Sequence, residues 1–581
     1  MTAPLGATAL GKATTFAVWA PRAKTVELRI VDRASTTLAT HPLTNDGGTW
    51  HARVEGVGAG TLYHFVVDGQ TLPDPRAQFL PFGVHGPAEV RGPLAPLQNP
   101  IHEPRPLNEQ ILYELHVGTF TREGTFASAA EKIGEIAALG VTTIELMPVS
   151  AFDGTRGWGY DGVAFFAPFA GYGTPDDLRS FIDIAHGYGL AVLLDAVYNH
   201  LGPSGNYLSA FDPAYFTAAV DTGWGDAPDF SHGPMRALVI DSVRHWLDYG
   251  FDGLRLDATH AIVDASEVHV VAEMTAIAAA MSPRRIVMVE DERNHSGVIT
   301  EWHADAVWAD DFHHTLHVAL TGEHDGYYSA YTGSADEIAK TITRGWLYEG
   351  EIYAPTGKSR GGSAAIIEAS RLVYCLQNHD QVGNRALGDR LGALVSAHAY
   401  DAVTMLLLFL PMTPLLFMGQ EWRSTTPFFY FTDHAPELGA KISEGRRREF
   451  AHFSAFRDEG ARSAIPDPQA RVTFERSRLD IAEATLESHQ ATRELHRRAI
   501  ALRREDAVLS QSHHRPTATA RGDVVVVRQE EGPEARYLVV NFGKTAVSLP
   551  EHAKDAVLLA SRDDAWADGK LASEAAVIFA R

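Results

Sequence analysis

Three acidic residues stand out in this sequence because each follows an apolar segment. Asp257, Glu290 and Asp380 all occur where such a segment ends. An ionised carboxylate in that position is costly unless it is paired, hydrogen-bonded or used in chemistry. Carboxylates gathered at one site suit glycosyl transfer, in which one attacks or stabilises an oxocarbenium-like centre and another protonates the leaving oxygen. We therefore predict that these three residues are catalytic.

The neighbours of two of these acids predict different protonation states. Arg255 precedes Asp257 by two residues, so strand alternation places both side chains on one face, where the arginine should keep Asp257 ionised. Glu290 follows the apolar run 286–289, and burial together with nearby carboxylates should raise its pKa. This separates a nucleophile from a proton donor. A structural ion pair that closes a strand end would explain Arg255 and Asp257 equally well.

An alternation of apolar strands and helical segments must position these acids. From residue 111 onward we expect eight apolar strands, most of them followed by a helix or a loop. Such a series predicts an α/β fold, a closed (β/α)8 TIM barrel with long loop insertions. An open, doubly wound sheet is the alternative, but no GxGxxG turn follows an early strand to support it.

Polar residues recur at the expected carboxyl ends of these strands, which converge on one mouth of a barrel. They are Asp195, Asn199 and His200 after the third strand, Asp257 after the fourth, Glu290 and Asp291 after the fifth, Asp310 and Asp311 after the sixth, Asn378, His379 and Asp380 after the seventh, and Gln420 and Glu421 after the eighth. Scattered, solvated charge does not explain this regular placement. The mouth of the barrel is therefore the predicted site of catalysis.

Two smaller modules flank the predicted barrel. Residues 1–98 contain short alternating strands without a convincing helix between them, which predicts an N-terminal β-sandwich. The barrel is expected over 99–507, and 508–581 should form a C-terminal antiparallel β domain. Neither flanking module contains a catalytic cluster. A packing role is preferred for both, and sugar binding by the first is the alternative.

Composition excludes several classes of partner. The formal net charge is -23, which argues against nucleic acid or an anionic membrane and suits a neutral substrate. One cysteine, Cys375, rules out an internal disulfide and fits a reducing compartment. The first residues lack a basic segment followed by a long apolar core, so we expect a soluble, cytoplasmic protein.

The histidines do not predict a metal centre. The chain has 27 of them, but none is set at a ligand spacing such as HExxH, and no cysteine cluster exists. We expect neither a catalytic metal nor another cofactor. Asn199 could be a calcium ligand, but hydrogen bonding to a loop would explain it as well.

Large aromatic residues in predicted loops fit a carbohydrate cleft, because flat rings can stack on pyranose faces. Trp158 and Tyr160 lie in RGWGYDG, Tyr207 in GNYL and Trp224 in GWGDAPDF. A packing role remains the alternative for each of them singly.

Four stretches, DAVYNH, GLRLDATH, VMVEDE and QNHDQ, occur in this order at the third, fourth, fifth and seventh expected strands. They resemble the conserved regions of the α-amylase superfamily of retaining glycoside hydrolases. The resemblance implies that Asp257 is the nucleophile, Glu290 the general acid and base, and Asp380 the carboxylate that stabilises the transition state. It also implies that Asp195, His200, Arg255 and His379 contact the sugar or the catalytic groups, and that Tyr160 is a stacking platform. Asn378 joins this predicted set.

Longer stretches are similar to one family of that superfamily, the trehalohydrolases that act on malto-oligosyltrehalose. They are residues 157–208, 308–328 and 378–390. The similarity implies hydrolysis of the α-1,4 bond next to a terminal trehalose, with malto-oligosyltrehalose and related α-glucans as binding partners and a possible functional pairing with a malto-oligosyltrehalose synthase. Asp311, His313, His314 and Glu323 are then candidates for binding the trehalose end.

One departure from the common α-amylase pattern bears on the substrate. Common α-amylases often have Lys-His two and three residues after the nucleophile, whereas this chain has Thr259 and His260. That weakens a plain starch endohydrolase, and His260 becomes a candidate substrate contact. A glycogen branching or debranching enzyme is the alternative function. A non-catalytic glucan-binding protein is a remote alternative, because it would not need the three acids.

Overall fold

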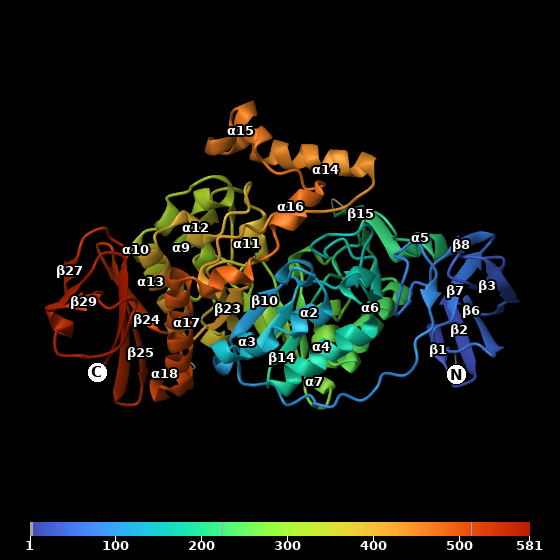
Figure 1. Ribbon diagram of the computed structural model, residues 1–581, viewed down its shortest axis with the longest axis horizontal. Helices are drawn as coiled ribbons and strands as arrows, with labels where there is room; N and C mark the ends of the chain where they lie inside the picture. Colours follow the sequence, from blue (N-terminus) through green and yellow to red (C-terminus); the bar gives the residue numbers. More distant parts are fainter. Residues whose placement is uncertain (1–3, 223–224, 513) are drawn as a thin grey trace.

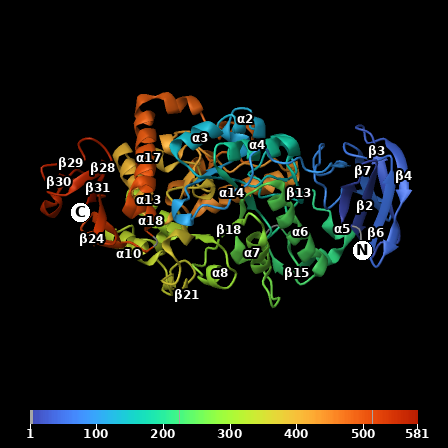
Figure 2. The same ribbon diagram turned by 90° about the horizontal axis from the view of Figure 1, so that it is seen from below.

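A computed structural model describes residues 4–222, 225–512 and 514–581. Figure 1 shows a small β domain at each end of the chain with a barrel of strands and helices between them. The same three-part arrangement is seen from below in Figure 2. The predicted fold class is confirmed: an α/β barrel flanked by two antiparallel β modules.

The N-terminal module consists of two antiparallel sheets, as the alternating pattern predicts. One has the order β1-β2-β6-β5 and the other the order β4-β3-β7-β8, with β9 added to β7. The two sheets enclose apolar side chains such as Phe16 and Phe65, both 0% exposed. The strands are β1 (Gly6–Ala9), β2 (Ala13–Trp19), β3 (Val26–Val31), β4 (Thr37–Pro42), β5 (Thr44–Asp46), β6 (Thr49–Glu55), β7 (Leu62–Val67), β8 (Gln70–Leu72) and β9 (Ala88–Glu89).

The eight strands expected from the sequence close into a parallel barrel in chain order. They are β10 (Leu112–Leu115), β11 (Thr143–Leu146), β14 (Ala191–Ala196), β17 (Gly253–Leu256), β18 (Ile286–Val289), β19 (Ala306–Trp308), β22 (Leu372–Cys375) and β23 (Thr413–Phe417). Because β10 also pairs with β23, the barrel has no open sheet edge.

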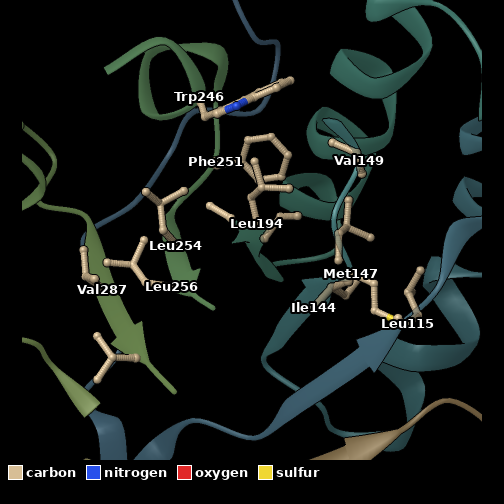
Figure 3. Packing of buried hydrophobic residues seen from close by; sticks show 14 of the residues in the cluster. Leu115, Ile144, Met147, Val149, Leu194, Trp246, Phe251, Leu254, Leu256 and Val287 are labelled. Carbon is tan, nitrogen blue, oxygen red and sulfur yellow. The ribbon is translucent and has the colours of Figure 1, made fainter. Parts of the chain in front are cut away.

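The two faces of these strands have different roles. Outward side chains such as Leu194, Leu254 and Leu256 belong to the core between the barrel and the surrounding helices. Figure 3 shows them in one cluster with Phe251, which lies next to Trp246 of α6 (Gly233–Tyr249). Inward side chains near the strand starts, including Leu112 and Leu193, form a separate apolar cluster.

Polar side chains follow on the same inward face. Glu114, Asp195 and Arg255 each lie two residues beyond an inward residue of their strand, and all three are buried. The interior thus changes from apolar to ionisable toward the carboxyl ends of the strands.

Most strands of the barrel are followed by at least one helix. The longer helices are α4 (Pro175–Gly187), α6, α7 (Val270–Ala280), α9 (Asp311–Thr321), α10 (Ala335–Arg344), α13 (Ala397–Phe409) and α17 (Glu487–Glu505). Shorter ones are α1 (Val117–Phe120), α2 (Phe126–Ala130), α3 (Ile133–Leu139), α5 (Leu208–Phe211), α8 (Gly297–Thr300), α11 (His379–Gly383) and α12 (Leu391–Leu394). Two-stranded ribbons in the loops are β12 (Ser150–Ala151) with β13 (Ala164–Pro168), β15 (Phe216–Asp221) with β16 (Asp226–Pro228), and β20 (Ile352–Tyr353) with β21 (Lys358–Ser359).

The connection from α6 to β17 shows why the sequence turns where it does. Gly250 caps α6 with φ 126°, a conformation that side-chain-bearing residues rarely adopt. The chain then runs directly into the buried strand that delivers Arg255 and Asp257.

A helical excursion precedes α17 and lies across the top of the view in Figure 1. It contains α14 (Pro436–Glu449), α15 (Glu459–Ser463) and α16 (Arg471–Arg476). Arg446 of α14 donates to the backbone oxygens of Gly383, the last residue of α11, and of Arg385 just after it, both at 2.9 Å. These bonds tie the excursion to the barrel mouth.

The C-terminal module is antiparallel, as expected. A five-stranded sheet of order β24-β25-β26-β31-β28 is accompanied by a three-stranded sheet of order β27-β30-β29. Its strands are β24 (Thr517–Arg521), β25 (Val524–Glu531), β26 (Glu534–Asn541), β27 (Val547–Ser548), β28 (Ala556–Ala560), β29 (Trp566–Ala567), β30 (Lys570–Leu571) and β31 (Ala575–Ala580). Helix α18 (Ala507–Gln511) leads into it. The boundaries at residues 98 and 507 stay predictions. Within the described ranges, no helix is long and apolar enough to cross a membrane.

Candidate active site

Strand ends bring the predicted catalytic acids to one mouth of the barrel. Asp257 follows β17, Glu290 follows β18, and Asp380 lies in the first turn of α11, just after β22. Because all three strands are parallel members of one closed sheet, their carboxyl ends point the same way. The three acids therefore come from segments that are distant in sequence.

Arg255 is the centre of the site. Its side chain is 0% exposed, and its Nη1 donates to Asp195 at 2.7 Å and to Asp257 at 2.9 Å. Its Nη2 donates to Glu290 at 2.6 Å. The guanidinium carbon lies 4.3 Å from the ring centre of Trp308, which adds a cation–π contact. Arg255 and Asp257 do share a face, as strand alternation predicts, but the arginine also contacts two further carboxyl groups.

The surroundings of Asp257 favour its ionised form. Burial alone would raise its pKa, but Arg255 and the hydrogen bond from Asn199 outweigh burial and lower the pKa below its usual value. Asn199 Nδ2 donates to Asp257 Oδ2 at 2.7 Å and to its backbone oxygen at 2.9 Å. A buried carboxylate that is ionised and held in place is suited to nucleophilic attack.

Glu290 shows the opposite shift. Burial raises its pKa well above the usual value, and the pull of Arg255 does not cancel this because Asp257 and Asp380 also raise it. The backbone N–H of Ala258 donates to Glu290 Oε2 at 3.1 Å, which fixes the carboxyl group. Glu290 therefore carries a proton at a pH where Asp257 does not, the division of roles expected for an acid and a nucleophile.

A second set of buried polar side chains, linked by hydrogen bonds, reaches the site from β10 and from the segment after β22. Glu114 of β10 accepts hydrogen bonds from His379 Nδ1 at 2.5 Å and from its backbone N–H at 2.9 Å. The other ring nitrogen of His379 lies 2.7 Å from the hydroxyl of Tyr160, which donates to Asp195 at 2.6 Å. Burial would lower the pKa of His379, but Asp380 and Glu114 outweigh it and raise the pKa to about 10. These neighbours favour the protonated ring, and its two hydrogen-bonded contacts fix its orientation.

Asp380 differs from the other two acids in its exposure. Its side chain is 34% exposed and lies 3.4 Å from His379 Nε2. Asn384 Nδ2 donates to its Oδ1 at 3.1 Å. Asp380 lines a cavity of about 560 Å³ together with Asp310, His314 and Arg360. We call this the catalytic cavity because Asp380 lines it, although Asp257 and Glu290 are not among its lining residues. Its size falls within the range of ordinary ligand sites.

Several other predicted contacts lie around this centre. Trp158 is buried, donates from its indole N–H to the backbone oxygen of Phe429 at 2.9 Å, and meets the His379 ring edge-on at 5.6 Å. His200 contacts Asn199 through one ring nitrogen and the backbone oxygen of Tyr160 through the other.

Two further predicted residues contact groups other than the three catalytic acids. Asn378 caps α11 by accepting from the backbone N–H of Gln381 at 2.8 Å. His260 lies 3.7 Å from Glu292. Trp224 falls outside the residues that the structure describes.

The four residues predicted for the trehalose end separate into different positions. His314 lines the catalytic cavity. Asp311 is 0% exposed and accepts from Asn294, from Tyr331 and from the backbone N–H of Leu347 in the loop after α10. His313 is buried between the backbone oxygen of Leu376 and the hydroxyl of Tyr328. Glu323 lies in the wall of a neighbouring cavity.

Sequence reasoning missed two residues of the mouth, Glu114 and Arg360, and it placed Asp310 at the mouth without giving it a role in the site. Asp310 lies two residues after the inward-facing Trp308 and lines the catalytic cavity, and strand alternation explains its inward position. Burial first, and then Asp380, raise the pKa of Asp310 to about 6. Arg360 lies in a loop beside β21, where no periodic pattern marks it, and it contacts Tyr331 and Tyr353.

The described residues hold no group of three or more His, Cys, Asp or Glu side chains that could bind a metal ion. Asn199, considered above as a calcium ligand, directs its amide nitrogen to Asp257 and its oxygen to His200.

Comparisons with known proteins agree with this architecture. The family model for carbohydrate-binding module 48, the isoamylase N-terminal domain, matches residues 4–80, and the model for the α-amylase catalytic domain matches residues 106–214. A crystal structure of a putative α-amylase from Salmonella typhimurium has a TM-score of 0.92 and 35% sequence identity, with 100% of each chain covered.

Sequence identity to known proteins identifies the family within the α-amylase superfamily to which the chain belongs. The chain is 46% identical over 557 residues to the malto-oligosyltrehalose trehalohydrolase of Deinococcus radiodurans, with 94% of this chain and 91% of the relative covered. The corresponding enzyme of Rhizobium sp. is 39% identical, with 95% of each chain covered. A 1,4-alpha-glucan branching enzyme of Jannaschia sp. is 29% identical, but only 45% of this chain and 41% of that enzyme are covered. This chain therefore belongs to the malto-oligosyltrehalose trehalohydrolase family, within the α-amylase superfamily of glycoside hydrolases.

Proposed function

We propose that this protein hydrolyses the α-1,4-glucosidic bond next to the terminal trehalose of malto-oligosyltrehalose and releases trehalose and a malto-oligosaccharide. The observation that carries the proposal is the single guanidinium of Arg255, which contacts both Asp257, whose pKa is lowered, and Glu290, whose pKa is raised. Two carboxyl groups held by one guanidinium are close together, which favours the retaining geometry of about 5–5.5 Å over the wider inverting one.

The proposed reaction has two steps. In the first, Asp257 attacks the anomeric carbon while Glu290 gives its proton to the oxygen of the leaving trehalose, which forms a glycosyl ester on Asp257. In the second, Glu290, now ionised, takes a proton from water, and the water oxygen displaces Asp257 from the anomeric carbon. The chain thus regains its initial protonation state.

The remaining predicted residues receive supporting roles in this proposal. Asp380 binds hydroxyl groups of the reacting sugar, the buried His379 supports Asp380 from a distance of 3.4 Å, and Tyr160 provides a flat ring beside them. Asp195 accepts hydrogen bonds from both Arg255 and Tyr160 and so holds these two side chains in position. We assign His379 its orientation through Glu114, which acts as a positioning residue because it contacts the histidine rather than the cavity.

The trehalose end is assigned to the catalytic cavity. His314, Arg360 and Asp310 line it and supply donors and acceptors for sugar hydroxyls. Asp311 and His313 support the same wall from behind, because their polar atoms are bonded within the protein. We also propose that His260, Trp158, His200 and Asn378 contribute to substrate binding around the site.

Net charge and the similar proteins also bear on the binding partners and the location of the protein. The acidic charge of -23 supports a neutral α-glucan as substrate rather than nucleic acid or an anionic membrane. We propose a cytoplasmic location and a functional pairing with a synthase that supplies the trehalose-ended glucan. The branching or debranching alternative is less well supported, because the trehalohydrolases cover nearly the whole chain and the branching enzyme less than half.

A conservative substitution tests the proposal. Asp257→Asn removes the nucleophilic charge but keeps the size of the side chain and an acceptor for Asn199. Release of trehalose from maltopentaosyltrehalose, followed by chromatography, should fall on the order of 10³-fold or more, while the melting temperature stays close to that of the wild type. Residual activity within tenfold of the wild type would remove Asp257 from its role.

A further inference from the structure

A second cavity of about 670 Å³ adjoins the catalytic cavity. Its walls come from 322–328 after α9, from 384–386 after α11 and from 449–456 after α14. The two cavities share Tyr327 and Asn384 as lining residues. Since Asn384 also donates to Asp380 at 3.1 Å, the second cavity begins one side chain away from a proposed catalytic acid.

The second cavity is lined by aromatic rings and by a few polar side chains that are held in place by hydrogen bonds. Phe453 and Phe456 are partly exposed, and Tyr327 is 37% exposed. Phe450 is buried behind them, with its ring centre 4.9 Å from that of Phe453. Exposed rings in a concave site provide apolar faces for a ligand, and a few placed polar groups orient it.

The charges of the second cavity disfavour an anionic ligand. Arg385 donates to both carboxylate oxygens of Glu323, at 2.6 and 2.9 Å, so its charge is already paired. Asp325 and Glu449 add acidic groups to the wall. A phosphate or carboxylate would meet like charge here, whereas a neutral, hydroxylated ligand would not.

Hydrogen bonds connect the segments that line the second cavity, so the fold determines its shape. Asp325 accepts from the hydroxyl of Ser454 at 2.6 Å and from its backbone N–H at 3.0 Å. Arg446 fixes the same excursion to the end of α11 and lies over Phe450, 4.7 Å from its ring centre. The aromatic wall is thereby held opposite the Glu323–Arg385 pair.

We propose that this second cavity binds glucose units of the glucan portion of the substrate, beyond the unit held at Asp257 and Glu290. The inference rests on the proposed function for the identity of the substrate. Three points favour this occupant: the second cavity shares lining residues with the catalytic cavity, its lining suits a neutral sugar, and the two units of the trehalose end are assigned to the catalytic cavity. Pyranose faces then stack on Phe453 and Phe456, and the Glu323–Arg385 pair and Asn384 bond the hydroxyls.

Chain length gives this inference a sharp test. In Phe453→Ala, kcat/KM for maltopentaosyltrehalose should fall about fivefold to tenfold through loss of one aromatic contact, mostly in KM. The same constant for glucosyltrehalose, which is too short to reach the second cavity, should stay within twofold. An equal loss on both substrates, or no loss on either, would overturn the inference.

Matched variants guard against indirect effects. Tyr188→Ala removes an aromatic side chain that is 58% exposed at the end of α4, away from both cavities, and should leave both substrates unaffected. Phe456→Ala is the second variant of the wall and should reproduce the length-dependent loss. Circular dichroism and melting temperature check that each variant folds.

Binding measurements separate failure of this inference from failure of the proposed function. Maltohexaose is titrated calorimetrically into the wild type, Phe453→Ala and Tyr188→Ala. Weaker binding in Phe453→Ala alone supports a glucan site whether or not trehalose is released in the activity assay. Equal affinities in all three proteins would overturn the site, even if trehalose release is confirmed.

Discussion

Replacing Glu114 with Gln tests whether a residue that never faces the cavity controls the catalytic centre. Glu114 accepts two hydrogen bonds from His379, one from the ring and one from the backbone. Glutamine has one acceptor oxygen and no charge, so one of the two donors loses its partner and the other loses a charge-assisted bond.

The magnitude follows from the type of bond that is lost. Hydrogen bonds to charged groups contribute about 1.5–3 kcal/mol, and about 1.36 kcal/mol corresponds to one pKa unit. The pKa of His379, raised to about 10 in part by Glu114, should therefore fall by roughly one to two units. If the lost bond energy is felt in the transition state, kcat/KM at neutral pH should fall on the order of 10- to 100-fold.

The sign of the pH effect can be worked out from the direction of the shift. A histidine whose folded pKa lies above its unfolded value stabilises the protein fully at low pH and loses that contribution as pH rises through the folded pKa. In Glu114→Gln this contribution should be smaller, and its loss, which begins near the unfolded pKa in both proteins, should be complete at a lower pH than in the wild type. Titration of the His379 ring by ¹⁵N NMR and melting temperatures between pH 6 and 10 measure both effects.

Glu145 provides the matched control. It lies beside Glu114 in register on β11 and is also 0% exposed, and within the described part of the chain its carboxyl oxygens have no hydrogen-bond partner. Burial raises its pKa well above the usual value, so it is already neutral and Gln replaces it with little electrostatic change. The reasoning is refuted if Glu145→Gln is as damaging as Glu114→Gln, or if the His379 titration is the same in Glu114→Gln as in the wild type.

Two further predictions follow from the site and its loops. Glu290→Gln should lower kcat roughly 10²- to 10⁴-fold and remove the fall in activity as pH rises through the raised pKa of Glu290, leaving the acid-side fall that belongs to Asp257; a pH–rate profile with an unchanged alkaline side would point to another acid. Gly159→Ala, next to Tyr160, should destabilise the protein by about 3 kcal/mol or more, because Gly159 has φ 101° and an added Cβ would lie 2.1 Å from the backbone oxygen of Pro148. Gly189→Ala is its control, with φ 75° and no atom within 4 Å of the added Cβ, and should cost only about 1–2 kcal/mol; equal changes in melting temperature for the two variants would contradict the steric argument.

The sequence was sufficient for the fold because the barrel strands are nearly continuous apolar runs. Their inward and outward faces are both buried, so each strand is visible without knowledge of its partners. The positions of Asp257 and Glu290 followed from the same pattern, since each comes directly after such a run. The ion pair between Arg255 and Asp257 followed from a spacing of two residues.

Contacts between distant segments could not be predicted in the same way. Glu114 is hidden inside the strand sequence LYEL, and its partner His379 is 265 residues further along the chain. Asp310 and Asp311 are adjacent, but α9 begins at Asp311 and turns that side chain into the protein, while Asp310 stays on the inward face set by Trp308. Arg360 and the 449–456 wall belong to long insertions whose course depends on tertiary packing alone.

The most direct test of the whole account is a proton NMR time course with maltopentaosyltrehalose and the wild-type protein. We predict that trehalose and maltopentaose appear in equal amounts, and that the maltopentaose is first formed as the α-anomer before it mutarotates, because a retaining reaction passes through a glycosyl ester on Asp257. First formation of the β-anomer, or formation of new α-1,6 branches without release of trehalose, would contradict the account.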